Sequence, residues 1–60
     1  MTDPAHLNTY RDAAGYYFIE VVQGADRITI TPPMASNIEA GQALKQIRAA
    51  TGLPIRKVSA

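Results

Sequence analysis

The sequence predicts a small α+β domain in which an antiparallel sheet packs one face against a single α-helix. Residues 16–22 and 27–31 have the composition and alternation of two paired strands. Residues 36–52 carry the start signal, the apolar stripe and the stop signal of one helix. With 60 residues, the chain is expected to form a single domain over residues 1–60.

The two segments before the helix predict a β-hairpin. Residues 16–22, Tyr-Tyr-Phe-Ile-Glu-Val-Val, are rich in the β-branched and aromatic side chains that favour strands. In residues 27–31 polar and apolar side chains alternate, so the two isoleucines share one face. Residues 23–26 include a glycine and suit the hairpin loop. The two prolines at 32–33 have no backbone N–H and end the ladder.

The helix is delimited at both ends. Ser36 and Glu39 match a capping box, in which the serine hydroxyl accepts from the Glu39 amide and the glutamate reaches back to the Ser36 amide. Gly52 falls where a left-handed residue ends a helix, and Pro54 forbids its continuation. Leu53 is placed to pack back on the helix. The apolar stripe between these signals comprises Ala40, Ala43, Leu44 and Ile47.

The first fifteen residues allow two structures. Asp3-Pro4 and Gly15 bracket a short helix in one of them. In the other, residues 7–11 form a strand and residues 12–15 a type I turn, with aspartate at its first position and glycine at its fourth. We favour the strand and turn, because residues 8–10 are mediocre helix formers. The sheet is then a three-stranded meander.

Residues 55–58 predict a short C-terminal edge strand. The order of a strand, an Asp-x-x-Gly turn at residues 12–15, two further strands and a capped helix resembles small bacterial domains of the YegP type. The resemblance covers that turn and the order of the elements, and no functional residue is carried over from it.

The residue types of the chain indicate no catalytic, metal or cofactor site. There is no cysteine and one histidine, His6, whereas zinc sites use several such ligands. Ser36 is taken by the helix cap, and the glycines match neither a phosphate-binding loop nor a dinucleotide fingerprint. We therefore expect a protein that is not an enzyme and that binds no cofactor and no small-molecule substrate. The alternative within the enzyme class is a small oligomeric enzyme whose active site lies at a subunit boundary.

Charge divides the chain into two parts. Residues 1–39 hold two bases and five acids, a net charge of −3, whereas residues 40–60 hold four bases and no acid, a net charge of +4. Such a split marks a contact surface for an acidic protein, a contact surface for nucleic acid, or a solvated helix face. The isoelectric point of about 8.2 lies below the value of about 9 that nucleic-acid-binding domains exceed. The basic candidates for partner binding are Lys45, Arg48, Arg56 and Lys57.

The strand over residues 16–22 is apolar on both faces. One row comprises Tyr17, Ile19 and Val21, and the other comprises Tyr16, Phe18 and Val22, interrupted by Glu20. One helix covers one face of a small sheet, so something else is expected to cover the second row. The candidates are the N-terminal segment through Leu7 and Tyr10, a second copy of the chain, or a different partner. Tyr16, Phe18 and Val22 therefore join the basic residues as candidate partner-binding residues.

These observations favour a non-enzymatic protein-interaction module, an adaptor or an inhibitor, that binds another protein or a second copy of itself. No apolar run approaches the roughly 20 residues of a membrane span, and the N-terminus lacks a secretory pattern, so we expect a cytoplasmic protein. In scale and build the chain is similar to accessory proteins of phages and mobile elements, including anti-CRISPR-type inhibitors that occlude a larger machine. The alternative is a small dimeric nucleic-acid-binding regulator that uses the same basic residues.

Overall fold

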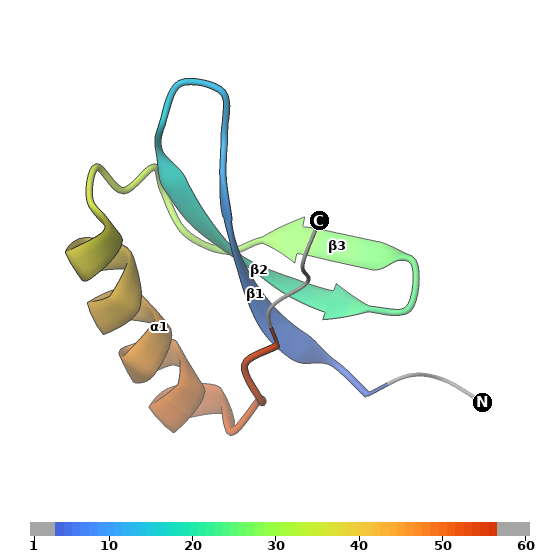
Figure 1. Ribbon diagram of the computed structural model, residues 1–60. Helices are drawn as coiled ribbons and strands as arrows, with labels where there is room; N and C mark the ends of the chain where they lie inside the picture. Colours follow the sequence, from blue (N-terminus) through green and yellow to red (C-terminus); the bar gives the residue numbers. More distant parts are fainter. Residues whose placement is uncertain (1–3, 57–60) are drawn as a thin grey trace.

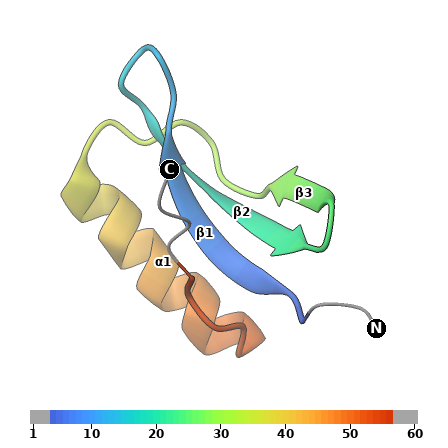
Figure 2. The ribbon, with the colours of Figure 1, turned by 45° about the vertical axis from the view of Figure 1, so that its right-hand side comes forward.

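The α+β prediction is confirmed by a computed structural model that describes residues 4–56. In chain order the elements are β1 (His6–Arg11), β2 (Tyr17–Gln23), β3 (Asp26–Thr29) and α1 (Asn37–Thr51). The strands form one antiparallel sheet in the order β1-β2-β3. The helix contacts β1 and β2 from one face of the sheet (Figure 1), and a turned view shows the helix and the sheet as two layers (Figure 2).

The first connection is the predicted Asp-x-x-Gly turn, and β1 is a strand. The Gly15 N–H donates to the Asp12 carbonyl at 3.1 Å, and the Asp12 carboxylate accepts from the Tyr16 N–H at 2.9 Å. Gly15 has a φ of 94°, in the left-handed region that other residues rarely adopt. The aspartate and the glycine together fix the reversal and leave no room for a helix over this segment.

The loop between β2 and β3 is shorter than the four residues expected. Gln23 and Asp26 are already paired, so Gly24 and Ala25 alone make the turn. Gly24 has a φ of 61° and Ala25 a negative one, the pattern of a type II′ hairpin turn. A type II′ turn matches the natural twist of the two strands, so the ladder extends by one residue on each side.

The third strand ends at Thr29 and does not extend to residue 31. Ile30 still donates to the Ile19 carbonyl at 2.9 Å, but the Ile19 N–H donates to the Thr31 hydroxyl at 3.0 Å, so a side chain replaces the backbone carbonyl. The two prolines that follow supply no donor, and the chain leaves the ladder.

Beyond the prolines the chain returns to β2. Met34 and Tyr17 exchange two backbone hydrogen bonds, at 2.8 and 3.0 Å, as an isolated bridge. The Met34 side chain is buried in the core, and the chain continues from it to the start of α1.

The helix begins and ends where the sequence predicts, with one difference at its cap. The Ser36 hydroxyl accepts from the Glu39 N–H at 3.1 Å. The Glu39 carboxylate accepts from the Ala35 N–H at 3.3 Å, so the expected return bond to Ser36 is wrong by one residue. Gly52 adopts the left-handed conformation, with a φ of 71°, and its N–H donates to the Arg48 carbonyl at 2.8 Å.

The core lies between α1 and the sheet. Leu7 and Ile19, from β1 and β2, are its two large side chains without exposed surface. Met34 and Ala40 complete the buried cluster from the loop and the helix. Half-buried side chains surround this cluster: Tyr17, Val21, Ala43, Leu44, Ile47 and Leu53. The predicted helix stripe therefore faces the sheet.

The segment after α1 returns to the outer edge of β1. The Leu7 N–H donates to the Pro54 carbonyl, and the Leu7 carbonyl accepts from the Arg56 N–H, both at 2.8 Å. These two bonds make a parallel bridge between Leu7 and Ile55. The edge strand predicted over 55–58 starts at this bridge, and its residues 57–58 lie outside the described part of the chain. No helix within residues 4–56 is long and apolar enough to cross a membrane.

Candidate interaction surfaces

The face of the sheet opposite α1 carries a polar and aromatic layer. The strand registers bring one side chain from each strand into two rows of this face, and a third row holds one side chain each from β1 and β2. The members of this layer are His6, Asn8, Tyr10, Phe18, Glu20, Val22, Arg27 and Thr29. No helix covers them, so their mutual contacts decide how much of this face is available to a partner.

Glu20 lies at the centre of this layer and is buried by its neighbours. The Asn8 amide donates to the Glu20 carboxylate at 2.8 Å, and the Arg27 guanidinium donates to both of its oxygens. Only 3% of Glu20 is exposed, whereas 61% of the Arg27 side chain is exposed. Burial by itself raises the pKa of Glu20, but the hydrogen bonds from Arg27 and Asn8, together with the charge of Arg27, outweigh it and hold that pKa below its ordinary value.

The aromatic side chains of the layer also contact other members of the layer. The Tyr10 and Phe18 rings stack with centroids 5.2 Å apart. The Tyr10 hydroxyl lies 2.8 Å from the Thr29 hydroxyl, so Tyr10 reaches from β1 across β2 to β3. The second apolar row is thus covered in part by Tyr10, while Leu7 points to the opposite face into the core. Phe18 and Val22 are half-buried, and Tyr16, just before β2, is exposed.

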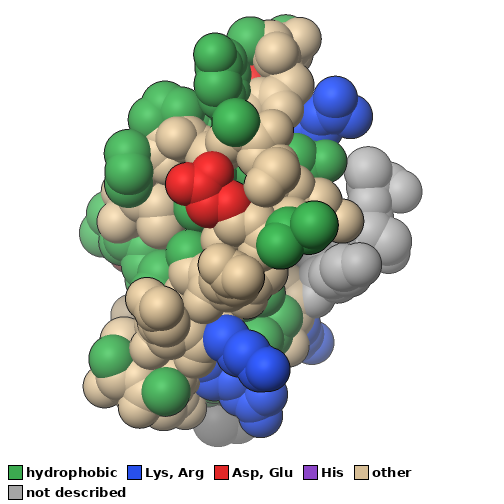
Figure 3. Space-filling view, turned by 90° about the vertical axis from the view of Figure 1, so that its left-hand side faces the viewer, with side chains coloured by type: hydrophobic (Ala, Val, Ile, Leu, Met, Phe, Trp, Pro, Cys, Tyr) green, Lys and Arg blue, Asp and Glu red, His purple; other side chains and the backbone are tan. Residues whose placement is uncertain are grey.

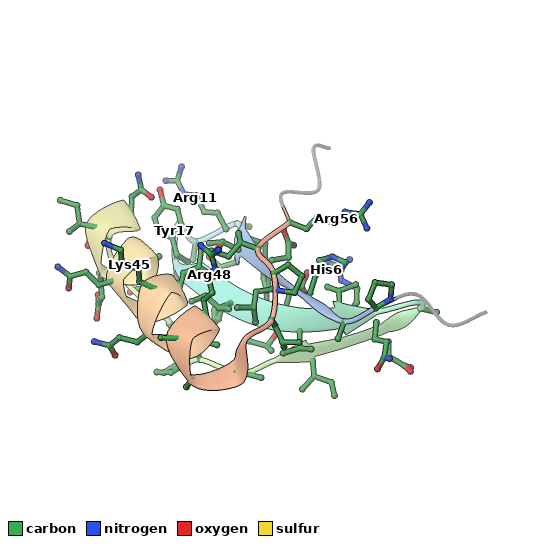
Figure 4. All side chains as sticks on the ribbon, turned by 90° about the horizontal axis from the view of Figure 1, so that it is seen from below. His6, Arg11, Tyr17, Lys45, Arg48 and Arg56 are labelled. Carbon is green, nitrogen blue, oxygen red and sulfur yellow. The ribbon has the colours of Figure 1, made fainter. Side chains whose placement is uncertain are left out.

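The basic side of the molecule comprises Arg11, Lys45, Arg48 and Arg56. Figure 4 shows all four side chains on one side, in the upper part of the view, although they come from β1, from α1 and from the segment after α1. Figure 3 shows basic side chains low on the helix side and again near the top right, with an acidic side chain at a height between them. All four are exposed, and none forms an ion pair with a carboxylate within residues 4–56. Lys57, the fourth basic residue predicted for this surface, lies outside the described residues.

The Arg11 side chain is held in one position on this side by its neighbours. Its guanidinium carbon lies 5.6 Å from the centroid of the Tyr17 ring. A Cβ atom at position 15 would lie 3.3 Å from the Arg11 guanidinium, so the glycine of the turn leaves the space that the arginine occupies. The stacked ring and the turn hold the cation in place without neutralising it.

The sheet has two outer edges. On β1 the backbone groups of Leu7 point outward to the C-terminal segment, and by alternation those of Thr9 and Arg11 also point outward. Within residues 4–56 no group bonds to the Thr9 or Arg11 N–H or carbonyl. On β3 the outward residues are Arg27 and Thr29. The two edges differ in charge, because Arg11 is unneutralised whereas Arg27 is paired with Glu20.

The sequence predicted Lys45, Arg48 and Arg56 as members of one basic surface, but it did not indicate Arg11. Arg11 was assigned to the end of a strand, and no sequence pattern indicates that β1 and the end of α1 share a side of the molecule. The Glu20 network was also missed. Its signal was present as one acid in an apolar strand, with Arg27 seven residues later across a hairpin.

Comparison with protein-family models, curated proteins and solved structures finds no match to this chain. In the part of the chain that the structure describes, no three side chains of His, Asp or Glu converge in a way that could hold a metal ion. His6 is half-buried opposite Val22, and neither of its ring nitrogens has a partner among the described residues.

Proposed function

We propose that the chain is a non-enzymatic protein-interaction module of the cytoplasm whose basic side binds an acidic surface of a partner protein. Bound there, it acts as an adaptor or as an inhibitor that occludes the partner. The observation that carries this proposal is that four exposed, unneutralised cations lie on one side of a chain whose net charge is only +1.

The helix dipole accounts for only part of this arrangement. Arg48 lies in the last turn of α1, where a cation is favoured by the negative end of the dipole. Arg11 belongs to β1 and Arg56 to the segment after the helix, so neither gains from that dipole. Their presence on the same side as Arg48 supports a binding surface over a merely solvated helix face.

The open face of the sheet supports a second contact less well. Its central acid is paired with Arg27, and Phe18 already stacks on Tyr10. A partner on that face would displace contacts that are already made. A partner on the basic side meets exposed cations whose charges no described carboxylate satisfies.

The test compares two variants that change the net charge equally. Lys45→Gln with Arg48→Gln removes two positive charges from the basic side. Gln42→Glu with Gln46→Glu adds two negative charges at other exposed positions of α1. Both variants lower the net charge by 2. Fluorescence anisotropy with a labelled acidic peptide should show a loss of affinity of at least about tenfold for the first pair and a smaller loss for the second.

Equal losses for the two pairs would mean that binding follows net charge and not this surface. A labelled DNA duplex, titrated in parallel, tests the alternative of a dimeric nucleic-acid-binding regulator. Binding of DNA but not of the peptide, with an affinity that falls steeply with salt, would replace the proposal by that alternative.

A further inference from the structure

We infer that the partner contributes an extended acidic segment, which adds to the sheet as a strand along the outer edge of β1 at Thr9 and Arg11. The inference rests on the proposed function and deepens it by naming the shape and charge of the bound segment. Strand addition supplies affinity through backbone hydrogen bonds, and the flanking side chains supply specificity.

The backbone of β1 is suited to this role. Leu7 already accepts a parallel neighbour on its outer edge, through bonds to Pro54 and Arg56 at 2.8 Å. The next outward residues, Thr9 and Arg11, continue the same edge, and no described group bonds to their N–H or carbonyl groups. A bound strand would therefore extend a row of edge hydrogen bonds that the protein itself begins.

Charge selects the occupant and the edge. The β1 edge ends at Arg11, which is held over Tyr17, and Arg56 lies beside Leu7 at the other end of the same edge (Figure 4). An acidic strand on this edge would meet these cations, whereas a basic one would be repelled. The β3 edge offers the same kind of backbone groups at Arg27 and Thr29, but its arginine is committed to Glu20. It is the natural internal control.

Amide hydrogen exchange of the whole chain, followed by NMR, tests the inference with the same acidic peptide as probe. At a peptide concentration of about ten times Kd, exchange through the free form slows about tenfold at any amide that the peptide covers. We expect this slowing at Thr9 and Arg11 and no change at the outward amides of β3, Arg27 and Thr29.

The other outcomes separate the inference from the proposed function. If the peptide binds, loses affinity with Lys45→Gln and Arg48→Gln, and leaves the Thr9 and Arg11 amides unchanged, strand addition is wrong and the charged surface stands. If the peptide does not bind, the proposed function fails.

Slow exchange at Thr9 and Arg11 in the free protein overturns the inference too. A dependence on protein concentration then identifies a second copy on the edge, and no dependence identifies the chain's own residues 57–60. If amide exchange slows only at Arg27 and Thr29, the peptide binds along the β3 edge and the inference is wrong.

Discussion

The Arg27 guanidinium lies over the Glu20 carboxylate on the face of the sheet that α1 leaves open. The register explains the pairing, because Thr29 is directly opposite Glu20 and Arg27 is its diagonal neighbour, within reach of a long side chain. Asn8 approaches the same carboxylate from β1. One acid in an apolar strand therefore links all three strands.

This arrangement predicts how stability depends on pH. The folded-state pKa of Glu20 is lowered, so the unfolded chain takes up the proton more readily as the pH falls. The stabilisation by Glu20 is complete above the ordinary glutamate pKa of about 4.3 and is lost as the pH falls through the lower folded-state pKa. Urea unfolding at pH 7 and at pH 3 should show a smaller loss for Glu20→Gln than for the natural chain. Parallel pH curves for the two proteins would contradict this role.

Tyr10→Phe and Thr29→Ala probe the bond that spans β2. Each removes the hydroxyl contact at 2.8 Å and leaves the Tyr10–Phe18 stacking geometry available. We expect each to lower the free energy of unfolding by about 0.5 kcal/mol, because the bond is exposed to water. The double variant should cost less than the two single variants together. Additive losses in thermal unfolding would show that the hydroxyls act independently.

Leu7→Ala should remove most of the stability of the domain. Leu7 is fully buried, and such truncations cost about 2–5 kcal/mol. A domain of 60 residues has a total of only about 3–9 kcal/mol. The control is Ile38→Ala in α1, where 75% of the residue is exposed and the change should stay below about 0.5 kcal/mol. Circular dichroism in urea distinguishes the two, and similar midpoints would place Leu7 outside the core.

Gly52→Ala and Gly41→Ala should have opposite effects on stability. A Cβ atom would meet nothing within 4 Å at either position, so the backbone alone decides. Gly52 has a φ of 71°, and alanine there should cost about 1 kcal/mol. Gly41 lies inside α1, and alanine should stabilise the helix by about 0.5–1 kcal/mol. Melting temperatures that move in the same direction would refute the assignment of Gly52 as the helix terminator.

The elements that rest on local signals were predicted well from the sequence. The Ser36 hydroxyl on the Glu39 amide and the left-handed Gly52 each depend on neighbours within four residues. The Asp12 to Gly15 turn is equally local, and it decided the structure of the first fifteen residues. Where local chemistry closes a turn or a cap, composition and spacing are sufficient.

The features that the sequence did not show depend on contacts between distant residues. The Ile19 N–H donates to the Thr31 hydroxyl and not to a backbone carbonyl, which shortens β3. No strand propensity predicts this side-chain bond. Arg11, at the end of β1, shares one side of the molecule with Arg48 and Arg56, and this follows from how the helix and the segment after it are placed on the sheet. The candidate site was therefore predicted for the helix and the segment after it, but not for the strand that completes it.

The bridge at Leu7 has a consequence for folding during synthesis. On the ribosome Leu7 emerges long before Pro54 and Arg56, whose backbone groups complete its edge. A nascent chain that ends within α1 can form both hairpins, yet its first strand lacks its last neighbour and its core residue lacks full cover. Contacts of such long sequence separation form late and slow the final step. The edge at Leu7 is paired only after Pro54 and Arg56 have left the ribosome, and until then that part of β1 is open to other chains.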